Sequence, residues 1–529
     1  MLNLVETVMG LLVVVAALAL LARKMPVPYP ILLVLGGLGL AMIPGLPQVQ
    51  LAPELVFLVF LPPLLYPAAL FTPWRDFRAN LRPILLLAVG LVLFTTIAVG
   101  YLVHYFVPEV PLAAGFVLGA IISPPDAVAA KAIAEQIRVP HRIVTILEGE
   151  SLVNDATALV AFRFAVAAVV SGTFSFGEAA VQFLIVAVGG IAFGLAVGFI
   201  TAWIQKPIDD APIEITISLL TPFAAYLPAE QLGLSGVLAV VSAGLYHGWR
   251  IPEMTSSRTR LQAGPVWRMI EFLLNGFIFL LIGLQLPAVL HHLSGHTPSQ
   301  LVWYVVLISL AIIVIRILWV FPATYLPRVL VTNIRRRDPC PAWQHVTIVA
   351  WTGMRGVVSL AAALALPITL KNGSTFPGRE LILFLTFVVI LATLVVQGLS
   401  LPFIIRWLDV KDDRAEEKEE RHARLQANRS ALARIEELVA SAPQQSEPAQ
   451  RLRSEYEERI HQLESSEAET DRGARGLFSS DYEKLSIAAL EVERKTIRKL
   501  RDELVINDEV LRRIQRDIDL AEARLGEPS

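Results

Sequence analysis

The sequence predicts an all-α polytopic membrane protein with about thirteen transmembrane helices, followed by a helical cytoplasmic region. Of its 529 residues, 55% are hydrophobic and only 17% are charged, and the mean hydropathy is +0.59. A soluble domain carries about 25% charged residues. Apolar runs of the roughly 17–25 residues that span a bilayer recur as far as residue 407, and charge is concentrated after it. The chain therefore divides into a membrane transport domain, 1–407, and a cytoplasmic tail, 408–529.

The predicted transmembrane helices alternate with short loops. They occupy residues 4–22, 29–46, 53–71, 83–106, 111–134, 142–170, 178–203, 213–229, 232–248, 265–290, 300–326, 344–370 and 378–407. The eighth and ninth are short and meet near Pro228-Ala-Glu-Gln231. Joining them would leave twelve spans and move one terminus to the other side of the membrane.

The distribution of Lys and Arg predicts the orientation. The first apolar run precedes Arg23 and Lys24, which suits a retained first helix with its N-terminus outside. The cytoplasmic loops then hold Arg23, Lys24, Arg75, Arg78, Arg82, Arg138, Arg142, Lys206, Arg250, Arg258, Arg260, Arg328, Arg335, Arg336 and Arg337. The opposite loops hold no Lys or Arg before Lys371 and Arg379. This pattern follows the positive-inside rule, so we expect a plasma-membrane protein with a cytoplasmic C-terminus.

Two of the predicted helices are interrupted. The fifth contains Ile122-Ser-Pro-Pro-Asp126, where consecutive prolines remove main-chain donors and favour extended backbone. The twelfth contains Trp351-Thr-Gly-Met-Arg-Gly356, where glycines loosen the helix around an arginine. Interrupted helices in corresponding halves indicate inverted repeats with a binding site near the membrane midplane. We expect spans 1–6 and 8–13 to form such repeats, with spans 5 and 12 as crossed discontinuous helices.

The sixth helix carries an unusually polar stretch, residues 147–160. One helical face holds Glu148, Glu150, Ser151, Asn154 and Asp155. A charged side chain near the bilayer centre costs about 2.5–3.5 kcal/mol on insertion scales. We therefore expect this face to line an aqueous cavity and to bind a cation or a proton.

Asp155 and Asp126 are predicted at similar depths near the midplane. If spans 5 and 6 are neighbours, the two carboxylates, Ser151 and carbonyls freed by the break converge. Oxygen ligands of this kind suit an alkali cation. Burial favours the protonated carboxylic acid, so protonation and cation binding would compete for the same oxygens. Such competition produces exchange of a cation for a proton.

Asn154 beside Asp155 bears on stoichiometry. A second acid at this position would titrate, whereas a neutral amide can only coordinate or form hydrogen bonds. One titrating group predicts one proton per monovalent cation and no net charge movement. The amide could equally form an interhelical hydrogen bond, and the two roles are compatible.

Cationic side chains within the membrane need partners. Arg316 in span 11 is predicted at the depth of Glu150, and we expect a structural ion pair between them. Arg355 lies at the break of span 12, where Glu271 is its predicted partner; a surface-facing position is the alternative. Four further residues are predicted near the interfaces: Glu148 at the inner mouth, Arg163 at the outer side, Lys131 at the inner side, and His247 as an interfacial residue.

The tail, 408–529, is predicted to form helices near 415–440, 449–466 and 480–525. The pattern suits a small helical bundle, with a regulatory or dimer-contacting role as a further possibility. The single cysteine, Cys340, excludes an intramolecular disulfide.

Three segments resemble the monovalent cation/proton antiporter family, in the electroneutral branch that holds bacterial sodium/proton antiporters and animal sodium/proton exchangers. They are Ser123-Pro-Pro-Asp-Ala-Val128, Glu148-Gly-Glu-Ser-Leu-Val-Asn-Asp155 and Gly353-Met-Arg-Gly356, with weaker support from Leu61-Pro-Pro-Leu-Leu-Tyr66. The resemblance covers roughly residues 1–407 and not the tail.

The resemblance implies a role for each matching residue. Asp155 matches the aspartate that carries the ion and the proton, Asn154 its neutral neighbour, and Asp126 the aspartate of the unwound fifth span. Ser151 matches a ligand-side serine, and Glu150 the acid that pairs with an arginine, here Arg316. The family further implies a homodimer, a scaffold and a mobile six-helix core that moves the site by elevator-like alternating access.

Two departures from the family pattern bear on the choice of cation. Pro67 stands where many members have an acid, and Pro125 where many have a threonine, so a K⁺-preferring site is an alternative to Na⁺ or Li⁺. A cation channel or uniporter, and a sensor with vestigial transport, are further alternatives. An enzyme is not expected, because the sequence has no metal-ligand histidine pair, Ser/His arrangement or phosphate loop. The expected partners are monovalent cations, protons, the lipid bilayer and a second copy of the chain, with no nucleic acid and no cofactor.

Overall fold

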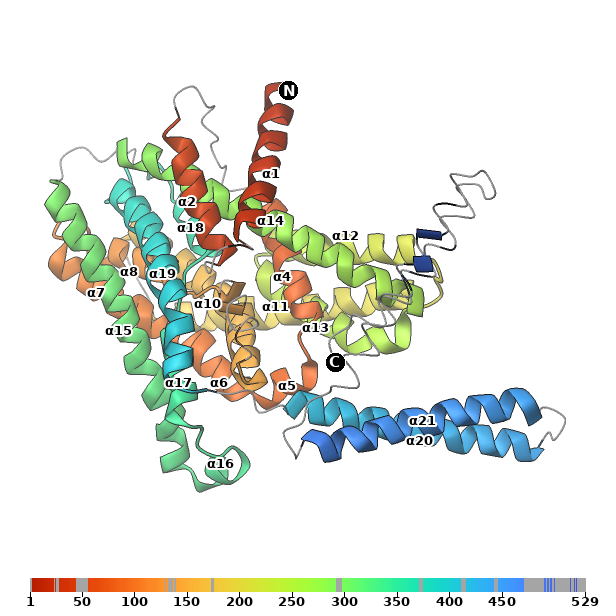
Figure 1. Ribbon diagram of the computed structural model, residues 1–529. Helices are drawn as coiled ribbons and strands as arrows, with labels where there is room; N and C mark the ends of the chain where they lie inside the picture. Colours follow the sequence, from red (N-terminus) through yellow and green to blue (C-terminus); the bar gives the residue numbers. More distant parts are fainter. Residues whose placement is uncertain are drawn as a thin grey trace. The chain divides into compact units, whose positions relative to one another are not determined.

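The computed structural model is all-helical in the part of the chain it describes (Figure 1). It describes residues 2–22, 24, 28–43, 56–128, 130–131, 137, 139–172, 176–291, 297–370, 374–410, 415–441, 446–470 and single residues between 490 and 520. Within these residues the only β-structure is an isolated bridge between Thr369 and Thr375. Most of the tail helix predicted at 480–525 lies outside the described residues.

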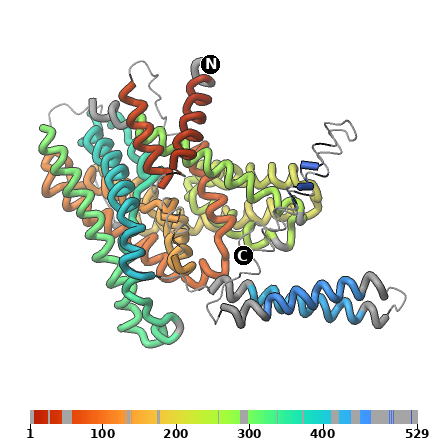
Figure 2. The backbone as a smooth tube through the Cα atoms, viewed as in Figure 1, coloured from red at the N-terminus to blue at the C-terminus, as the bar shows by residue number. Residues whose placement is uncertain are grey.

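The chain forms two compact units, Met1–Asp412 and Asp413–Ser529. In the second unit, α20 (Ala415–Ser441) and α21 (Ser446–Thr470) pack against each other as a helical hairpin (Figure 2). An ion pair between Arg429 and Glu464, 2.7 Å apart, joins these two helices.

The described helices of the first unit overlap each of the thirteen ranges predicted from the sequence, while α5 and α16 lie outside them. The N-terminal half contains α1 (Leu2–Ala22), α2 (Tyr29–Ala41), η1 (Val56–Phe60), α4 (Leu61–Leu70), α5 (Trp74–Ala79), α6 (Leu81–Leu85), η2 (Leu86–Leu91), α7 (Val92–Phe106), α8 (Leu112–Ile122), α10 (His141–Ser171) and α11 (Phe176–Gln205). The C-terminal half contains α12 (Ala211–Gln231), α13 (Gly236–Met254), α14 (Ser257–His291), α15 (Pro298–Leu330), α16 (Thr332–Arg337), α17 (Trp343–Trp351), α18 (Val357–Leu364) and α19 (Arg379–Trp407).

Six helical segments in the described residues are long and apolar enough to cross a membrane, by length and composition: Leu81–Phe106, His141–Ser171, Gly177–Gln205, Arg258–Gln285, Pro298–Leu330 and Arg379–Trp407. Shorter apolar helices lie at Glu6–Ala22, Tyr29–Ala41, Phe57–Leu70 and Leu112–Ile122. The chain is thus a multi-pass membrane protein. The count of thirteen spans and their orientation stay predictions.

The eighth and ninth predicted helices are separate. α12 ends at Gln231, and Gly233 adopts a left-handed conformation with φ 71°, which glycine reaches without strain. Ser235 then caps α13, because its hydroxyl accepts from the main-chain N–H of Leu238 at 3.2 Å. A turn and a new cap at this point exclude one continuous helix.

Two groups of helices lie on either side of α10 (Figure 1). One contains α7, α8, α15, α17, α18 and α19, and the other contains α4, α11, α12, α13 and α14; α10 packs against members of both. In the first group α7 and α8 approach closely, since a Cβ on Gly119 would lie 2.5 Å from the Thr96 carbonyl oxygen. The two main apolar clusters follow these groups only in part, because residues 278–282 of α14 pack with the first cluster and Val358 of α18 packs with the second.

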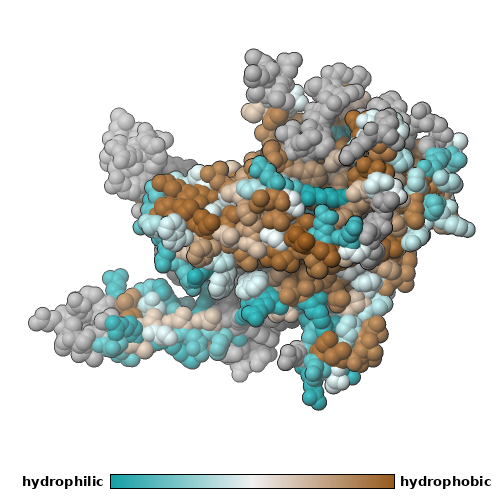
Figure 3. All heavy atoms as spheres, turned by 180° about the vertical axis from the view of Figure 1, so that it is seen from behind, coloured by the Kyte–Doolittle hydropathy of each residue, from teal (hydrophilic) through white to brown (hydrophobic). Residues whose placement is uncertain are grey.

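Large apolar side chains cover much of the outer surface of the first unit (Figure 3). α11 exposes Val181, Leu184, Ile185 and Val188 at 60–62%. α15 likewise exposes Val302, Val306, Leu310 and Leu318 at 51–63%. A surface of this kind suits lipid chains rather than water as its surroundings.

Candidate ion-binding site

The two interrupted helices meet at their breaks. In a continuous helix the N–H of Asp126 would bond to the carbonyl of Ile122, four residues earlier. Here the N–H of Asp126 donates instead to the carbonyl of Met354, at 2.6 Å. The Ile122 carbonyl accepts from Nε of Arg355, at 2.9 Å. Main-chain groups freed in one break are therefore satisfied by the other.

The carboxylate of Asp126 lies against the first turn of α18. It accepts from the N–H of Val128 at 2.8 Å, and the N–H of Val357 also donates to it. A Cβ on Gly356 would lie only 1.8 Å from Asp126 Oδ2. The absence of a side chain at Gly356 thus lets the carboxylate reach the helix N-terminus, where the helix dipole favours negative charge.

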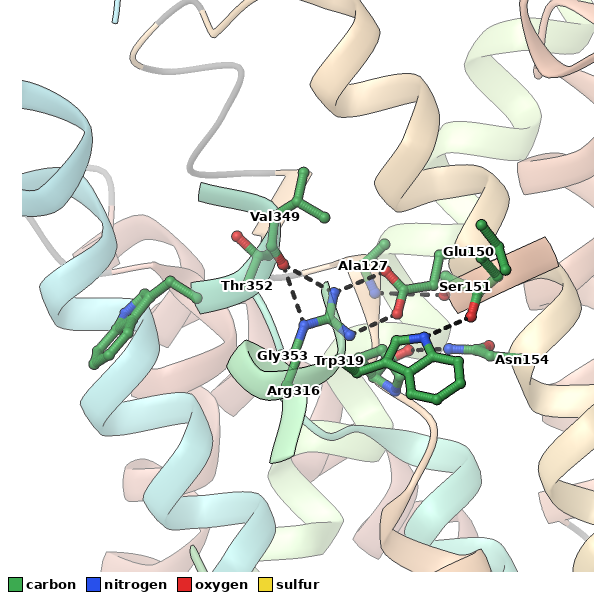
Figure 4. A network of polar contacts seen from close by, with 12 residues as sticks. Ala127, Glu150, Ser151, Asn154, Arg316, Trp319, Val349, Thr352 and Gly353 are labelled. Carbon is green, nitrogen blue, oxygen red and sulfur yellow. Dashed lines mark hydrogen bonds and ion pairs between the residues drawn. The ribbon is translucent and has the colours of Figure 1, made fainter. Parts of the chain in front are cut away.

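The polar face of α10 lies opposite this break (Figure 4). Asn154 Nδ2 donates to the carbonyl of Pro125 at 2.7 Å, and Ser151 Oγ accepts from the N–H of Ala127 at 3.4 Å. Asp155 follows Asn154 and is 8% exposed, whereas Asp126 is only partly buried. The charges of Asp155 and Asp126 are close enough to repel each other. The predicted convergence of these four residues is present.

The predicted ion pair between Glu150 and Arg316 is also present and is bidentate (Figure 4). Arg316 Nη1 donates to Glu150 Oε1 at 2.6 Å and Nη2 donates to Oε2 at 2.8 Å. Both side chains are 1% exposed. Nε and Nη2 of Arg316 also donate to the carbonyl of Val349, at 3.2 and 3.1 Å, in the last turn of α17 before the break. The pair therefore links α10, α15 and α17.

Trp319 lies one turn beyond Arg316 in α15 and links this helix to span 4. Its Nε1 donates to the carbonyl of Leu86 at 2.9 Å, in the π-helical segment η2. A Cβ on Gly90 would lie 2.5 Å from the indole ring. A π-helical turn widens the backbone and frees a carbonyl, which the indole uses here. Nothing in the sequence pattern predicted this contact.

The predicted pairing of Arg355 with Glu271 is wrong. The guanidinium of Arg355, which is 2% exposed, donates to the carbonyl oxygens of Ile122 and Gly353. These carbonyls are available because the breaks interrupt the helical bonding that would otherwise use them. Arg355 also lies within electrostatic range of both Arg316 and Glu150.

α19 holds the second break in place through polar side chains that were not among the predicted site residues. Thr393 Oγ1 accepts from the N–H of Arg355 at 3.2 Å, and Gln397 Nε2 donates to the carbonyl of Trp351 at 2.9 Å. Ser400 Oγ accepts from the indole N–H of Trp351 at 2.9 Å. Their spacing of three or four residues puts them on one face of an otherwise apolar helix, a signal that was available in the sequence.

The residues predicted near the interfaces have specific partners. Glu148 Oε1 lies 2.6 Å from Lys131 Nζ, and Arg163 forms an ion pair with Glu230. His247, predicted as interfacial, is instead 2% exposed. Its ring nitrogens contact the hydroxyl of Tyr66 and Oε1 of Gln205, both at 2.5 Å, which satisfies a buried imidazole.

The site brings together oxygen atoms of the kind that bind alkali cations. It combines two carboxylates, two neutral oxygen-bearing side chains and a pair of broken helices whose ends carry partial charge. Such an arrangement defines the binding site of a membrane transporter.

Comparison with known proteins identifies the kind of transporter. Residues 10–407 match the transmembrane region of the sodium/hydrogen exchanger family. The chain is 36% identical to an uncharacterised Na⁺/H⁺ exchanger of Mycobacterium tuberculosis over 99% of this chain and 97% of that protein. It is 34% identical to the Na⁺/H⁺ antiporter ApNhaP of Aphanothece halophytica over 90% of this chain and 88% of that protein.

A solved structure has the same fold. The sodium proton antiporter MjNhaP1 from Methanocaldococcus jannaschii superposes with a TM-score of 0.60 at 20% identity, over 77% of this chain and 98% of that one. The chain belongs to the sodium/hydrogen exchanger family, a family of monovalent cation/proton antiporters.

Proposed function

We propose that the protein is a secondary active antiporter that exchanges one monovalent cation for one proton by alternating access. The charge balance of the site carries this proposal. The charged residues at the site are the buried Glu150, Arg316, Arg355 and Asp155 and the partly buried Asp126. With all five ionised, two positive charges oppose three negative ones. One negative charge is left, and one Na⁺ or one proton neutralises it.

Asp155 is the residue at which cation and proton compete. Asp126 accepts from two main-chain N–H donors, Val128 just after the first break and Val357 at the start of α18, which stabilise its ionised form. Glu150 is neutralised by its bidentate pair with Arg316. For Asp155 no comparable donor or cation partner is found among the described residues. Its carboxylate is thus available to exchange a cation for a proton.

The range of cations follows from the ligands that this chain lacks. Pro67 is buried in α4 where an acid would add negative charge, and the carbonyl of Pro125 accepts from Asn154. Fewer anionic ligands weaken the preference for the smallest cations. We propose transport of Na⁺ with Li⁺ and K⁺ as further substrates; a relative in Bacillus pumilus, 37% identical over 81% of this chain and 65% of its own length, is named as a sodium, potassium, lithium and rubidium/H⁺ antiporter.

We further propose that the protein works as a homodimer in the plasma membrane, with its C-terminal tail in the cytoplasm, in pH and cation homeostasis. The tail is proposed as a regulatory region. The arginine-rich loops of one side support this orientation.

Proton flux in proteoliposomes tests the function. An imposed Na⁺, Li⁺ or K⁺ gradient should move protons in the opposite direction in wild type. The Asp155→Asn variant should show no cation-driven proton movement. Clamping the membrane potential during Na⁺-driven exchange with a permeant ion other than K⁺, which is itself a proposed substrate, should leave the rate unchanged. Proton movement that Asp155→Asn retains in full would refute the role of Asp155. Cation flux without coupled protons would indicate a channel or uniporter instead.

A further inference from the structure

Ser359 in the first turn of α18 is a buried polar residue that neither the predicted site nor the ion pairs use. Its side chain is 1% exposed, and its hydroxyl has no hydrogen-bond partner in the protein among the described residues. Unpaired buried hydroxyls are rare because their desolvation is not compensated. This hydroxyl therefore needs an explanation.

The break in span 12 explains why the hydroxyl is free. Ser and Thr within helices usually donate to the carbonyl four residues earlier. Thr352, Thr386 and Thr393 do so here, at 2.7–2.8 Å. For Ser359 the residue four positions earlier is Arg355, which lies in the non-helical break. Its carbonyl is not placed to accept, so the broken helix leaves the hydroxyl unbound.

Ser359 also lies at the end of α18 that carries the site. It is in the first turn of this helix, three residues after the N-cap Gly356. Gly356 packs directly against the Asp126 carboxylate. α18 packs against α10, which carries Asp155, and against α8, which leads into the first break.

A second unpaired oxygen lies on α10. The carbonyl of Pro125 can only accept, so Asn154 must turn its NH₂ group toward it. The other amide atom, Oδ1, is then directed elsewhere, and it has no partner among the described residues although Asn154 is 0% exposed. The orientation of the amide follows from its hydrogen bond and is not arbitrary.

We propose that Ser359 Oγ, together with Asn154 Oδ1, completes the coordination of the transported cation between Asp155 and Asp126. This inference rests on the proposed function and names ligands for the same site. Alkali cations take several oxygen ligands, and the two carboxylates alone offer few. Neutral oxygens add ligands without adding charge, so they keep one proton exchanged per cation.

The experiment compares Ser359→Ala with wild type in proteoliposomes, with initial rates of proton movement measured against Na⁺, Li⁺ and K⁺ concentration at fixed pH. Loss of one neutral ligand should raise the KM of the preferred cation about ten-fold, while the maximal rate stays within about two-fold. Ser359→Thr, which keeps the hydroxyl, should restore the wild-type KM. The matched control is Ser309→Ala in α15, because Ser309 also has a buried unpaired hydroxyl but lies away from both breaks.

A second measurement separates binding from transport. Na⁺ should raise the melting temperature of the detergent-solubilised wild type, and Ser359→Ala should need about ten-fold more Na⁺ for the same shift. If Ser359→Ala is not monodisperse, the same measurements are made on Ser359→Cys, because sulfur is a poor ligand for alkali cations. An unchanged KM for all three cations in an active variant would overturn the inference. A wild type that moves no protons under any cation gradient would instead overturn the proposed function.

Discussion

The main-chain N–H of Asp126 donates to the carbonyl of Met354, 2.6 Å away and more than two hundred residues along the chain. In turn, Nε of Arg355 donates to the carbonyl of Ile122, at 2.9 Å. Each bond replaces one that a broken helix has lost. The two breaks are therefore mutually dependent, and the position of the Asp126 carboxylate depends on the backbone of span 12.

Gly356→Ala tests this dependence. The new Cβ would lie 1.8 Å from Asp126 Oδ2, so the carboxylate would have to leave the start of α18. We expect cation-driven proton transport to fall at least about ten-fold, as for other displacements of a positioned group. Initial rates in proteoliposomes measure this effect.

The control for this prediction is Gly264→Ala in α14. A Cβ there would have no neighbour closer than 3.7 Å, and Ala favours the helix. Transport by Gly264→Ala should equal that of wild type. Equal transport by Gly356→Ala and wild type would show that Asp126 does not need its place at the helix end.

Removal of one partner of the Glu150–Arg316 pair should destabilise the protein. The remaining charge would be buried at 1% exposure without its counter-ion, which costs about 3–5 kcal/mol. We expect Glu150→Gln and Arg316→Gln to lower the melting temperature in detergent. The double variant Glu150→Arg with Arg316→Glu should recover part of this loss. A swap that recovers nothing would argue that Val349 and the surrounding helices, rather than the ion pair, determine stability.

Thr393→Val tests the support that α19 gives to the break. The variant keeps the shape of the side chain but leaves the N–H of Arg355 without its acceptor, at a cost of about 1–3 kcal/mol. We expect a lower melting temperature together with slower transport. Thr386→Val is the matched control, since within the described part of the chain the buried Thr386 hydroxyl donates only to the carbonyl of Ile382 in its own helix. If both variants behave alike, the Thr393–Arg355 bond has no special role.

Asn154→Asp should change the electrical character of transport. An ionised aspartate cannot donate to the carbonyl of Pro125 and adds a second titrating group beside Asp155. The rate at saturating Na⁺ should then depend on membrane potential, whereas the rate of wild type should not. Asn154→Ser, a neutral variant, serves as control and should stay insensitive to potential. Insensitivity of Asn154→Asp would contradict the one-for-one stoichiometry argued from this residue.

Much of the fold could be predicted from residues alone because its signals are local. Apolar runs, Pro124 and Pro125, and the glycines on either side of Arg355 each act on their own stretch of backbone. The convergence of Asp126, Ser151, Asn154 and Asp155 was also predictable, because the helix period and the membrane depth restrict where these side chains can lie.

The partners of the buried charges divide into two cases. Glu150 and Arg316 could be paired from sequence because both are charged, lie in apolar helices and share a depth. Arg355 could not, because its acceptors are the carbonyls of Ile122 and Gly353, and every residue carries a carbonyl. Side-chain chemistry identifies a carboxylate as a partner, but only packing decides which main-chain groups a guanidinium reaches.

For the site as a whole, too, residue types predict some features and only the packing of helices decides the others. Residue types and spacing were sufficient for the helices, the two breaks and the acidic motif of α10. Which freed main-chain groups satisfy each other, and which oxygens of Asn154 and Ser359 stay unpaired, depended on how distant helices pack. Hydrogen bonds act over about 3 Å, and no local pattern positions atoms two hundred residues apart to that precision.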